Sequence, residues 1–416
     1  MESCKIKVVN EGKEYFGTYH KSDKFSVVIQ DYFEADVFEE KETSRYKELL
    51  IKTSNNLYYY SPYFVREKVN FMASASQELS ARCYFAGKGG VNGAEVNSNI
   101  KVSSVVFHHP VISECFRSSC LSALHKDDQI IFTLLTKNIP RRQVEIKNHN
   151  IEKIELSSGY ECHHQPHKSV EIKTENFIKL VFSQSVSIED LPNYISEFNA
   201  FCNAYIPLGL KASRVFVHTD QGLDLEYFNR KLIDCEISDN RFYYPVNLDI
   251  LDFLQVIYKK IDYKSLENKN EYILIDFKEL PSLEDEFLFY FRYLNFHIGK
   301  LLEAERQSTD VSLYDIIKYF VDNYGYVFQK KGIVIEENLI NEIKSLRNHY
   351  VHEGYYLQNN KFEVSGGRRQ RLYDKEMDYY WLWKLVDALK LGSFIMFYKD
   401  LLNVDINEEE LSYCLK

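Results

Sequence analysis

Residues 346–354, with the sequence LRNHYVHEG, close the segment around which the chain is organised. The segment opens on the acidic residues Glu336 and Glu337, which favour the positive end of a helix dipole. It ends at Gly354, a residue that tolerates positive φ and therefore stops helices. The pattern predicts one helix from about residue 336 to about residue 353.

One face of this helix is apolar. A step of about 100° per residue aligns four apolar residues in one stripe, and two more widen it, namely Leu339, Ile343, Leu346, Tyr350, Ile340 and Val351. Arg347 falls inside the widened stripe. A charge at such a position is costly unless an anion meets it, so Arg347 requires a carboxylate, a second chain or a ligand phosphate.

The polar face carries Ser345, Asn348 and His352. Asn348 and His352 are four residues apart, so the amide is predicted to hold the imidazole in one orientation. Arg347 and His352 are about 140° apart around an ideal helix, and one undistorted helix therefore does not aim both at one phosphate. Either the last turn unwinds at Gly354, or two copies of the chain face each other.

The spacing of Arg347, Asn348 and His352 resembles the R-polar-x-x-x-H signature of HEPN ribonucleases. The flanking helical patterns and the continuation Gly354-Tyr355-Tyr356 look like the ApeA-type branch of abortive-infection HEPN proteins. The resemblance covers roughly residues 285–402. Over the N-terminal half it is one of layout only, a large domain that precedes a C-terminal HEPN bundle.

The resemblance implies a metal-independent endoribonuclease without a cofactor. His352 would act as general acid and base, Arg347 would stabilise charge on the phosphoryl oxygens, and Asn348 would orient His352 or touch the substrate. Transfer RNA is one candidate substrate. A homodimer through the HEPN domain, a role in anti-phage abortive infection and a phage-derived protein trigger complete the expectation, with the N-terminal domain as sensor or restraint.

RNA contacts are expected from the segment that follows the helix. Residues 361–371 carry four basic residues against one acidic, and Arg368, Arg369 and Arg371 suit phosphate. His349 and Lys344 on the helix itself are further candidates for RNA contact. The alternative is a solvated loop whose arginines pair with the nearby acids, which are Asp374, Glu376 and Asp378.

Other interpretations of the motif stay open. Arg347 can be a helix-end arginine paired with a glutamate, and His352 a C-terminal histidine favoured by the helix dipole. The chain would then be a non-catalytic HEPN-like module for dimerisation or partner binding. A zinc-stabilised nucleic-acid-binding protein is a third possibility.

The remaining patterns define the fold class. Apolar residues at helical spacing predict helices near residues 247–260, 285–305, 312–323 and 375–402. Upstream, one helix after Ser187 interrupts a series of short segments rich in β-branched and aromatic residues, at residues 5–10, 25–30, 49–52, 82–85, 101–107, 129–135, 143–147, 169–173, 177–182 and 213–217. The predicted fold is α+β. An antiparallel β-rich domain, a sandwich or a barrel, spans residues 1–243, and a helical HEPN bundle spans residues 244–416.

One cluster has the residue types of a metal site. Cys162, His163, His164 and His167 lie close together, and Cys115 and Cys120 offer further thiolates. A structural zinc needs four nitrogen or sulfur ligands, and no second half follows at a standard spacing. A polar loop between strands is therefore preferred, and no metal is expected.

Composition limits the remaining classes. The chain has 416 residues, eight scattered cysteines and a formal net charge of −10, which argues against a surface that coats nucleic acid generally. Aromatic content of 15% excludes a largely disordered chain. No signal-peptide core and no membrane-length apolar run is present, so a soluble cytoplasmic protein without membrane contact is expected.

Overall fold

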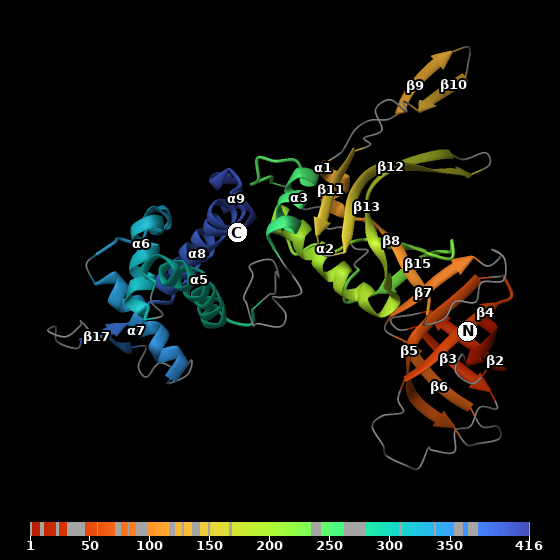
Figure 1. Cartoon of the computed structure of the whole chain (residues 1–416), viewed down its shortest axis with the longest axis horizontal. Coiled ribbons are helices and arrows are strands. Elements are labelled where there is room, and N and C mark those ends of the chain that lie inside the picture. The colour runs from red at the N-terminus through yellow and green to blue at the C-terminus, as the bar shows by residue number, and fades with distance from the viewer. Residues whose placement is uncertain are drawn as a thin grey trace. The chain divides into compact units, whose positions relative to one another are not determined.

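The computed structural model describes most of the chain (Figure 1). The described residues are 2–8, 12–21, 25–30, 46–55, 57–70, 76–81, 83–88, 99–115, 121–126, 129–134, 142–148, 150–165, 169–233, 243–261, 280–307, 310–336, 338–352, 361–364 and 373–415. None of the described helices is both long and apolar enough to cross a membrane.

The chain divides into two compact units. Unit 1 comprises Met1–Asn199, Leu210–Asn240 and Ile250–Tyr258. Unit 2 comprises Ala200–Gly209, Arg241–Asp249 and Lys259–Lys416. Between residues 199 and 259 the chain alternates between the two units. The predicted domain boundary, between residues 243 and 244, falls in this stretch.

Unit 1 contains a 13-stranded sheet in which every paired neighbour is antiparallel. Its strands are β1 (Glu2–Val8), β2 (Lys13–Lys21), β3 (Phe25–Gln30), β4 (Tyr46–Thr53), β5 (Leu57–Asn70), β6 (Ser76–Ala81), β7 (Cys83–Lys88), β8 (Lys101–His108), β11 (Arg142–Asn148), β12 (Ile151–Gln165), β13 (Ser169–Ser187), β14 (Arg214–Thr219) and β15 (Asp224–Asn229). Strands β9 (Leu121–Lys126) and β10 (Gln129–Leu134) form a separate hairpin.

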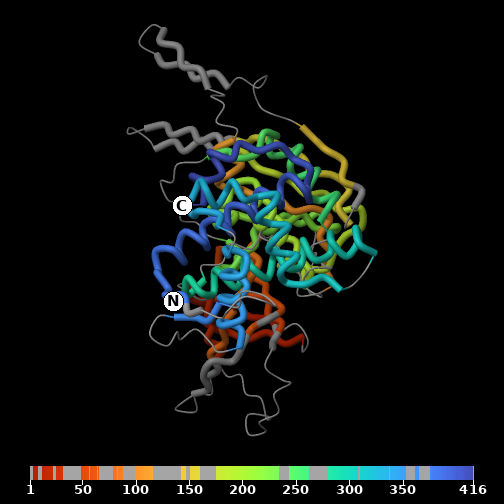
Figure 2. Tube along the Cα trace, turned by 90° about the vertical axis from the view of Figure 1, so that its left-hand side faces the viewer, coloured from red at the N-terminus to blue at the C-terminus, as the bar shows by residue number. Residues whose placement is uncertain are grey.

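Six of these strands close into a ring. The order β5-β4-β1-β2-β3-β6 returns to β5 because β6 pairs with both β3 and β5, and the ring can be followed along the red end of the chain (Figure 1 and Figure 2). Every strand of the ring sends buried side chains into one shared core, which includes Cys4, Ile6, Tyr19, Phe25, Val27, Ile29, Leu49, Ile51, Tyr59, Phe64, Leu79 and Ala81. Of the two predicted forms, a sandwich or a barrel, strands β1–β6 take the closed one, while the rest of the sheet does not close.

Two residues explain how the ring closes. Gly17 lies where a methyl group would overlap Ile6 and the Val28 carbonyl, so only glycine fits there. Pro62 lies in β5 between residues 57–60, which pair with β7, and residues 65–70, which pair with β6. A proline has no N–H to donate, and it occupies the point where β5 changes partner.

The rest of the sheet is open and continues from β5 through β7 to β11. Helices α1 (Pro110–Cys115), α2 (Leu191–Tyr205) and α3 (Ile250–Lys260) accompany it (Figure 1). Phe198 of α2 stacks on Phe107 of β8 with ring centroids 4.0 Å apart. Ser187 is an N-cap as predicted, because its hydroxyl accepts from the Asp190 N–H at 3.3 Å, but it caps a 3-10 turn (Ile188–Asp190), and α2 begins after that turn at Leu191.

Unit 2 is mainly helical. Its elements are α5 (Leu283–Arg306), α6 (Leu313–Lys330), α7 (Leu339–His352), α8 (Tyr379–Met396), a π-helical turn (Phe397–Leu402), α9 (Glu408–Cys414) and the hairpin of β16 (Lys361–Val364) and β17 (Tyr373–Glu376). Ser282 and Ser312 cap α5 and α6, each accepting from the third N–H of its helix. Gly392 of α8 allows close approach to α6, because a methyl group there would overlap the Phe320 ring.

For the two segments that follow α7, the predictions are wrong in detail. Residues 361–364 are a strand instead of part of a loop, because they pair with residues 373–376. The last predicted helix, at residues 375–402, begins only at Tyr379, where Asp378 caps it by accepting from the Tyr380 N–H at 2.9 Å. The α+β class is confirmed, with a large antiparallel sheet in the N-terminal part and helices in the C-terminal part.

Candidate functional site

The predicted motif lies at the end of α7, which packs against α5, α6 and β16. The four residues of the predicted stripe are buried, namely Leu339, Ile343, Leu346 and Tyr350. Val351 does not widen that stripe, since it is 42% exposed, and Ser345 is buried instead of lying on the polar face. The helix starts three residues later than predicted, because the Leu339 N–H donates to the Glu336 carbonyl in a turn before the helix begins.

Tyr350 fixes the last turn of α7. Its ring meets Phe287 of α5 edge to face, with centroids 5.8 Å apart. Burial raises the pKa of Tyr350, and nearby Glu284 and Tyr379 raise it further. The end of α7 is therefore bordered by the first turn of α5 and the first turn of α8.

Arg347 lies one turn before Tyr350 and is half-buried. Its Nη1 donates to Oδ1 of Asn348 at 3.1 Å. No carboxylate among the described residues forms an ion pair with it. Arg347 thus keeps a positive charge whose described partner is a neutral amide, and the sequence-based requirement for an anion is not met within the described part of the chain.

His352 is the last residue of α7 and is exposed. The amide oxygen of Asn348 is directed at Arg347, and no hydrogen bond joins Asn348 to His352, although both side chains are described. The structure therefore does not show the predicted orientation of the imidazole by Asn348. Lys344 and His349 are half-buried on the same helix, and the His349 ring lies 6.0 Å from that of Tyr350.

The other candidate residues lie either outside the described part of the chain or in an element of unit 1. Arg368, Arg369, Arg371 and Gly354 lie outside the described residues, as do His167 and Cys120. The backbone of residues 162–164 belongs to β12 and pairs with residues 170–172 of β13, so Cys162, His163 and His164 lie in a strand and not in the predicted loop. Among the described residues, no three His, Cys, Asp or Glu side chains are grouped closely enough to hold a metal ion.

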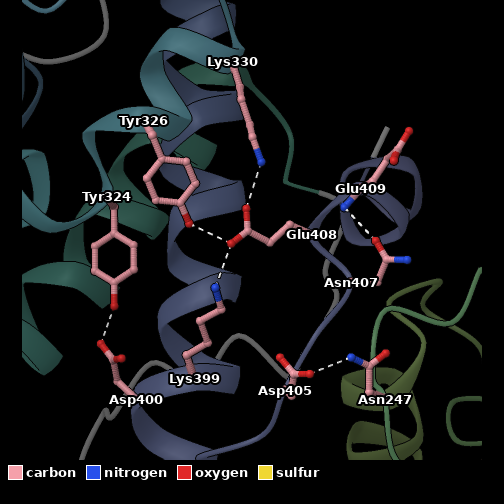
Figure 3. A network of polar contacts seen from close by, with 10 residues as sticks. All are labelled: Asn247, Tyr324, Tyr326, Lys330, Lys399, Asp400, Asp405, Asn407, Glu408 and Glu409. Carbon is pink, nitrogen blue, oxygen red and sulfur yellow. Dashed lines mark hydrogen bonds and ion pairs between the residues drawn. The ribbon is translucent and has the colours of Figure 1, made fainter.

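A charged cluster that the sequence did not predict surrounds Glu408 of α9 (Figure 3). Its carboxylate accepts from Lys330 Nζ at 2.8 Å, Lys399 Nζ at 2.7 Å and the Tyr326 hydroxyl at 2.9 Å. Partial burial acts to raise the pKa of Glu408, but these three hydrogen bonds outweigh it and lower the pKa to about 2. We refer to Glu408, Lys330, Lys399 and Tyr326 as the Glu408 cluster.

The Glu408 cluster has a structural character. Its four residues come from α6, the π-helical turn and α9, and neighbouring bonds attach residues 243–249 to the same region. Asn247 donates to Asp405 at 2.9 Å, and the Asn407 N–H donates to the Pro245 carbonyl at 2.7 Å. The acidic run that follows Asn407 signals a helix start in the sequence, but nothing in the sequence pairs Glu408 with lysines from distant positions.

Comparison with known proteins gives no relative. No family model, no curated protein and no solved structure matches the chain.

Proposed function

We propose that the chain is a metal-independent endoribonuclease of the HEPN type whose site is the end of α7. The observation that carries the proposal is Arg347, a half-buried cation whose described partner is the neutral amide of Asn348. A positive charge held at a helix end without a described counter-ion is suited to a phosphodiester. His352, exposed at the same helix end, adds an imidazole, the side chain that serves most often as a general acid or base.

The proposed reaction needs no external nucleophile. The 2′-hydroxyl of the substrate loses its proton to an imidazole and attacks the adjacent phosphorus. The bond from phosphorus to the 5′-oxygen breaks, and that oxygen takes up a proton. Arg347 stabilises the added negative charge on the phosphoryl oxygens. The products are a 2′,3′-cyclic phosphate and a 5′-hydroxyl.

The proposal includes a homodimer. Arg347 and His352 are five residues apart on an undistorted helix, so their side chains leave α7 about 140° apart. A second copy of α7 that faces the first supplies the missing side of the site. One copy of His352 then accepts the 2′-hydroxyl proton while the other donates to the leaving oxygen.

The proposed role in the cell rests on the resemblance to abortive-infection HEPN proteins. An unrestrained ribonuclease is toxic to its own cell, so the β-rich unit 1 is assigned the task of sensing or restraint. We propose that the enzyme acts as a toxic effector in anti-phage abortive infection and that a phage-derived protein is its trigger.

The proposal is tested with His352→Ala and purified RNA in the presence of EDTA. We expect cleavage to fall by about 10²- to 10⁴-fold, because a proton-transfer group is lost. End-labelled products of the parent should carry a 2′,3′-cyclic phosphate. Equal cleavage by parent and variant contradicts the proposal, and so does a parent that binds a partner protein through unit 2 and cleaves no RNA.

A further inference from the structure

The first turns of α8 present an unusual group of exposed rings. Tyr379 is 56% exposed, Tyr380 is 60% exposed and Trp383 is 49% exposed. No other element gathers three large exposed apolar side chains within the described part of the chain. Single exposed apolar residues are ordinary, whereas a group of them on one element indicates a binding surface.

The rings are arranged as a platform, which we define as Tyr379, Tyr380 and Trp383. Tyr380 and Trp383 are three residues apart on the helix, and their rings are nearly parallel, 15° apart in plane with centroids separated by 5.9 Å. Lys384 Nζ lies 4.3 Å from the centre of the Tyr380 ring. No carboxylate among the described residues pairs with Lys384, so its charge is available to a ligand.

The platform borders the site at the end of α7. Tyr379 lies near enough to Tyr350 to raise the pKa of that phenol, and Tyr350 follows Arg347 by one helical turn. The exposed residues Val351 and His352 complete the same helix end. The first turn of α8 therefore lies near the end of α7 that carries the proposed site.

We infer that the platform stacks the unpaired bases of a single-stranded RNA while Lys384 meets the adjacent phosphate, an inference that rests on the proposed function of the neighbouring site. Unpaired bases offer free π-faces, and aromatic side chains bind them without strong sequence preference. Bases inside a duplex are stacked on one another and do not reach the platform. The site is therefore specific for unpaired nucleotides.

The composition of the platform favours RNA over a second copy of the chain. Interface cores between protein chains are depleted in lysine, whereas a lysine beside stacked rings matches a base and its phosphate. The hydroxyl groups of the two tyrosines and the indole N–H also keep the surface compatible with water when it is empty. Charge and ring geometry thus match a nucleic acid strand.

Binding is measured in a His352→Ala background so that the RNA is not cut. The probes are a single-stranded RNA of about 12 nucleotides, long enough to cover a site of this kind, and its duplex. We expect the single strand to bind more tightly than the duplex, and Tyr380→Ala or Trp383→Ala to weaken its binding by roughly tenfold or more. Tyr380→Phe should bind as the background does, and Tyr314→Ala, an exposed tyrosine of α6, is the matched control.

Fluorescence gives an independent readout, because the only two tryptophans of the chain are Trp381 and Trp383. Trp381→Phe leaves Trp383 as the single reporter, and single-stranded RNA should quench it. Unchanged affinity in both alanine variants together with no quenching would overturn the platform, even if His352→Ala still abolishes cleavage. Alanine variants that lose dimers but keep RNA affinity would overturn it as well. Quenching by RNA in a parent that cleaves nothing would instead support the platform and refute the proposed nuclease.

Discussion

Unit 2 holds two half-buried charges in opposite situations. Glu408 receives hydrogen bonds from two lysines and a tyrosine, and they lower its pKa to about 2. Arg347 donates to a neutral amide, and no described carboxylate faces it. A charge that holds elements together is surrounded by partners, whereas a charge kept for a ligand is left incomplete. The contrast separates the residues that stabilise unit 2 from those proposed to act on RNA.

The largest expected effect concerns Arg347, the charge without an ionic partner among the described residues. Arg347→Ala should lower RNA cleavage by about 10²- to 10³-fold, because it removes a group that stabilises transition-state charge. Its effect on the free energy of unfolding should stay within about 0.5 kcal/mol, since no described ion pair is lost. Cleavage rates and thermal unfolding of the same preparation check both parts. A loss of stability without a loss of cleavage would show that Arg347 is a structural residue.

The second prediction concerns Glu408, the charge that accepts three side-chain hydrogen bonds. Glu408→Gln should lower the free energy of unfolding by about 1–3 kcal/mol, the usual range for hydrogen bonds to a charged group, with partial exposure keeping it from being larger. RNA cleavage per folded molecule should not change. Glu409→Gln is the matched control, because the neighbouring Glu409 side chain is exposed. Equal unfolding curves for the two variants would remove the contrast between Glu408 and Arg347.

The smallest expected effect is on the pH dependence of stability. It distinguishes whether Glu408 stabilises unit 2 through its charge or through packing. The pKa of Glu408 is lowered from 4.5 to about 2 on folding, so its stabilisation is complete above pH 4.5 and is lost as the pH falls from 4.5 to 2. The amide in the Glu408→Gln variant takes up no proton in this range. The difference in unfolding free energy between parent and variant should therefore shrink over this range. A difference that is constant from pH 6 to pH 3 would assign the stabilisation to packing instead of charge.

Alternation in the sequence predicted β3 but missed β2 and β15, whose burial also alternates. Phe25, Val27 and Ile29 of β3 alternate toward the core of the ring, and the limits of that strand were predicted correctly. Strand β5 escaped detection because it contains Pro62 at the point where it changes partner, a role that only the pairing reveals. A local sequence pattern reports only local structure. Strand β5 pairs with three other strands, so its formation depends on residues outside its own segment.

The candidate site was predictable to a similar degree. The stripe of α7 placed Tyr350 in the core, as the structure shows, whereas Arg347, predicted inside the widened stripe, is half-buried. The partner of Asn348 was not predicted, because helical spacing favours His352, four residues further on, whereas the amide oxygen accepts from the adjacent Arg347. The platform was missed because Tyr379 and Tyr380 look like core residues in a sequence that is rich in tyrosine.

The closed ring has a consequence for synthesis on the ribosome. All six of its strands lie within residues 2–81, and each pairs with strands close to it in sequence. The open sheet instead joins β7 to β15 and β8 to β14, pairs that require more than a hundred further residues to be made. Contacts between near residues form early, and long loops must close before distant strands can pair. The ring can therefore be complete while most of the chain is still being translated, and its β5 then presents an edge on which the later strands assemble.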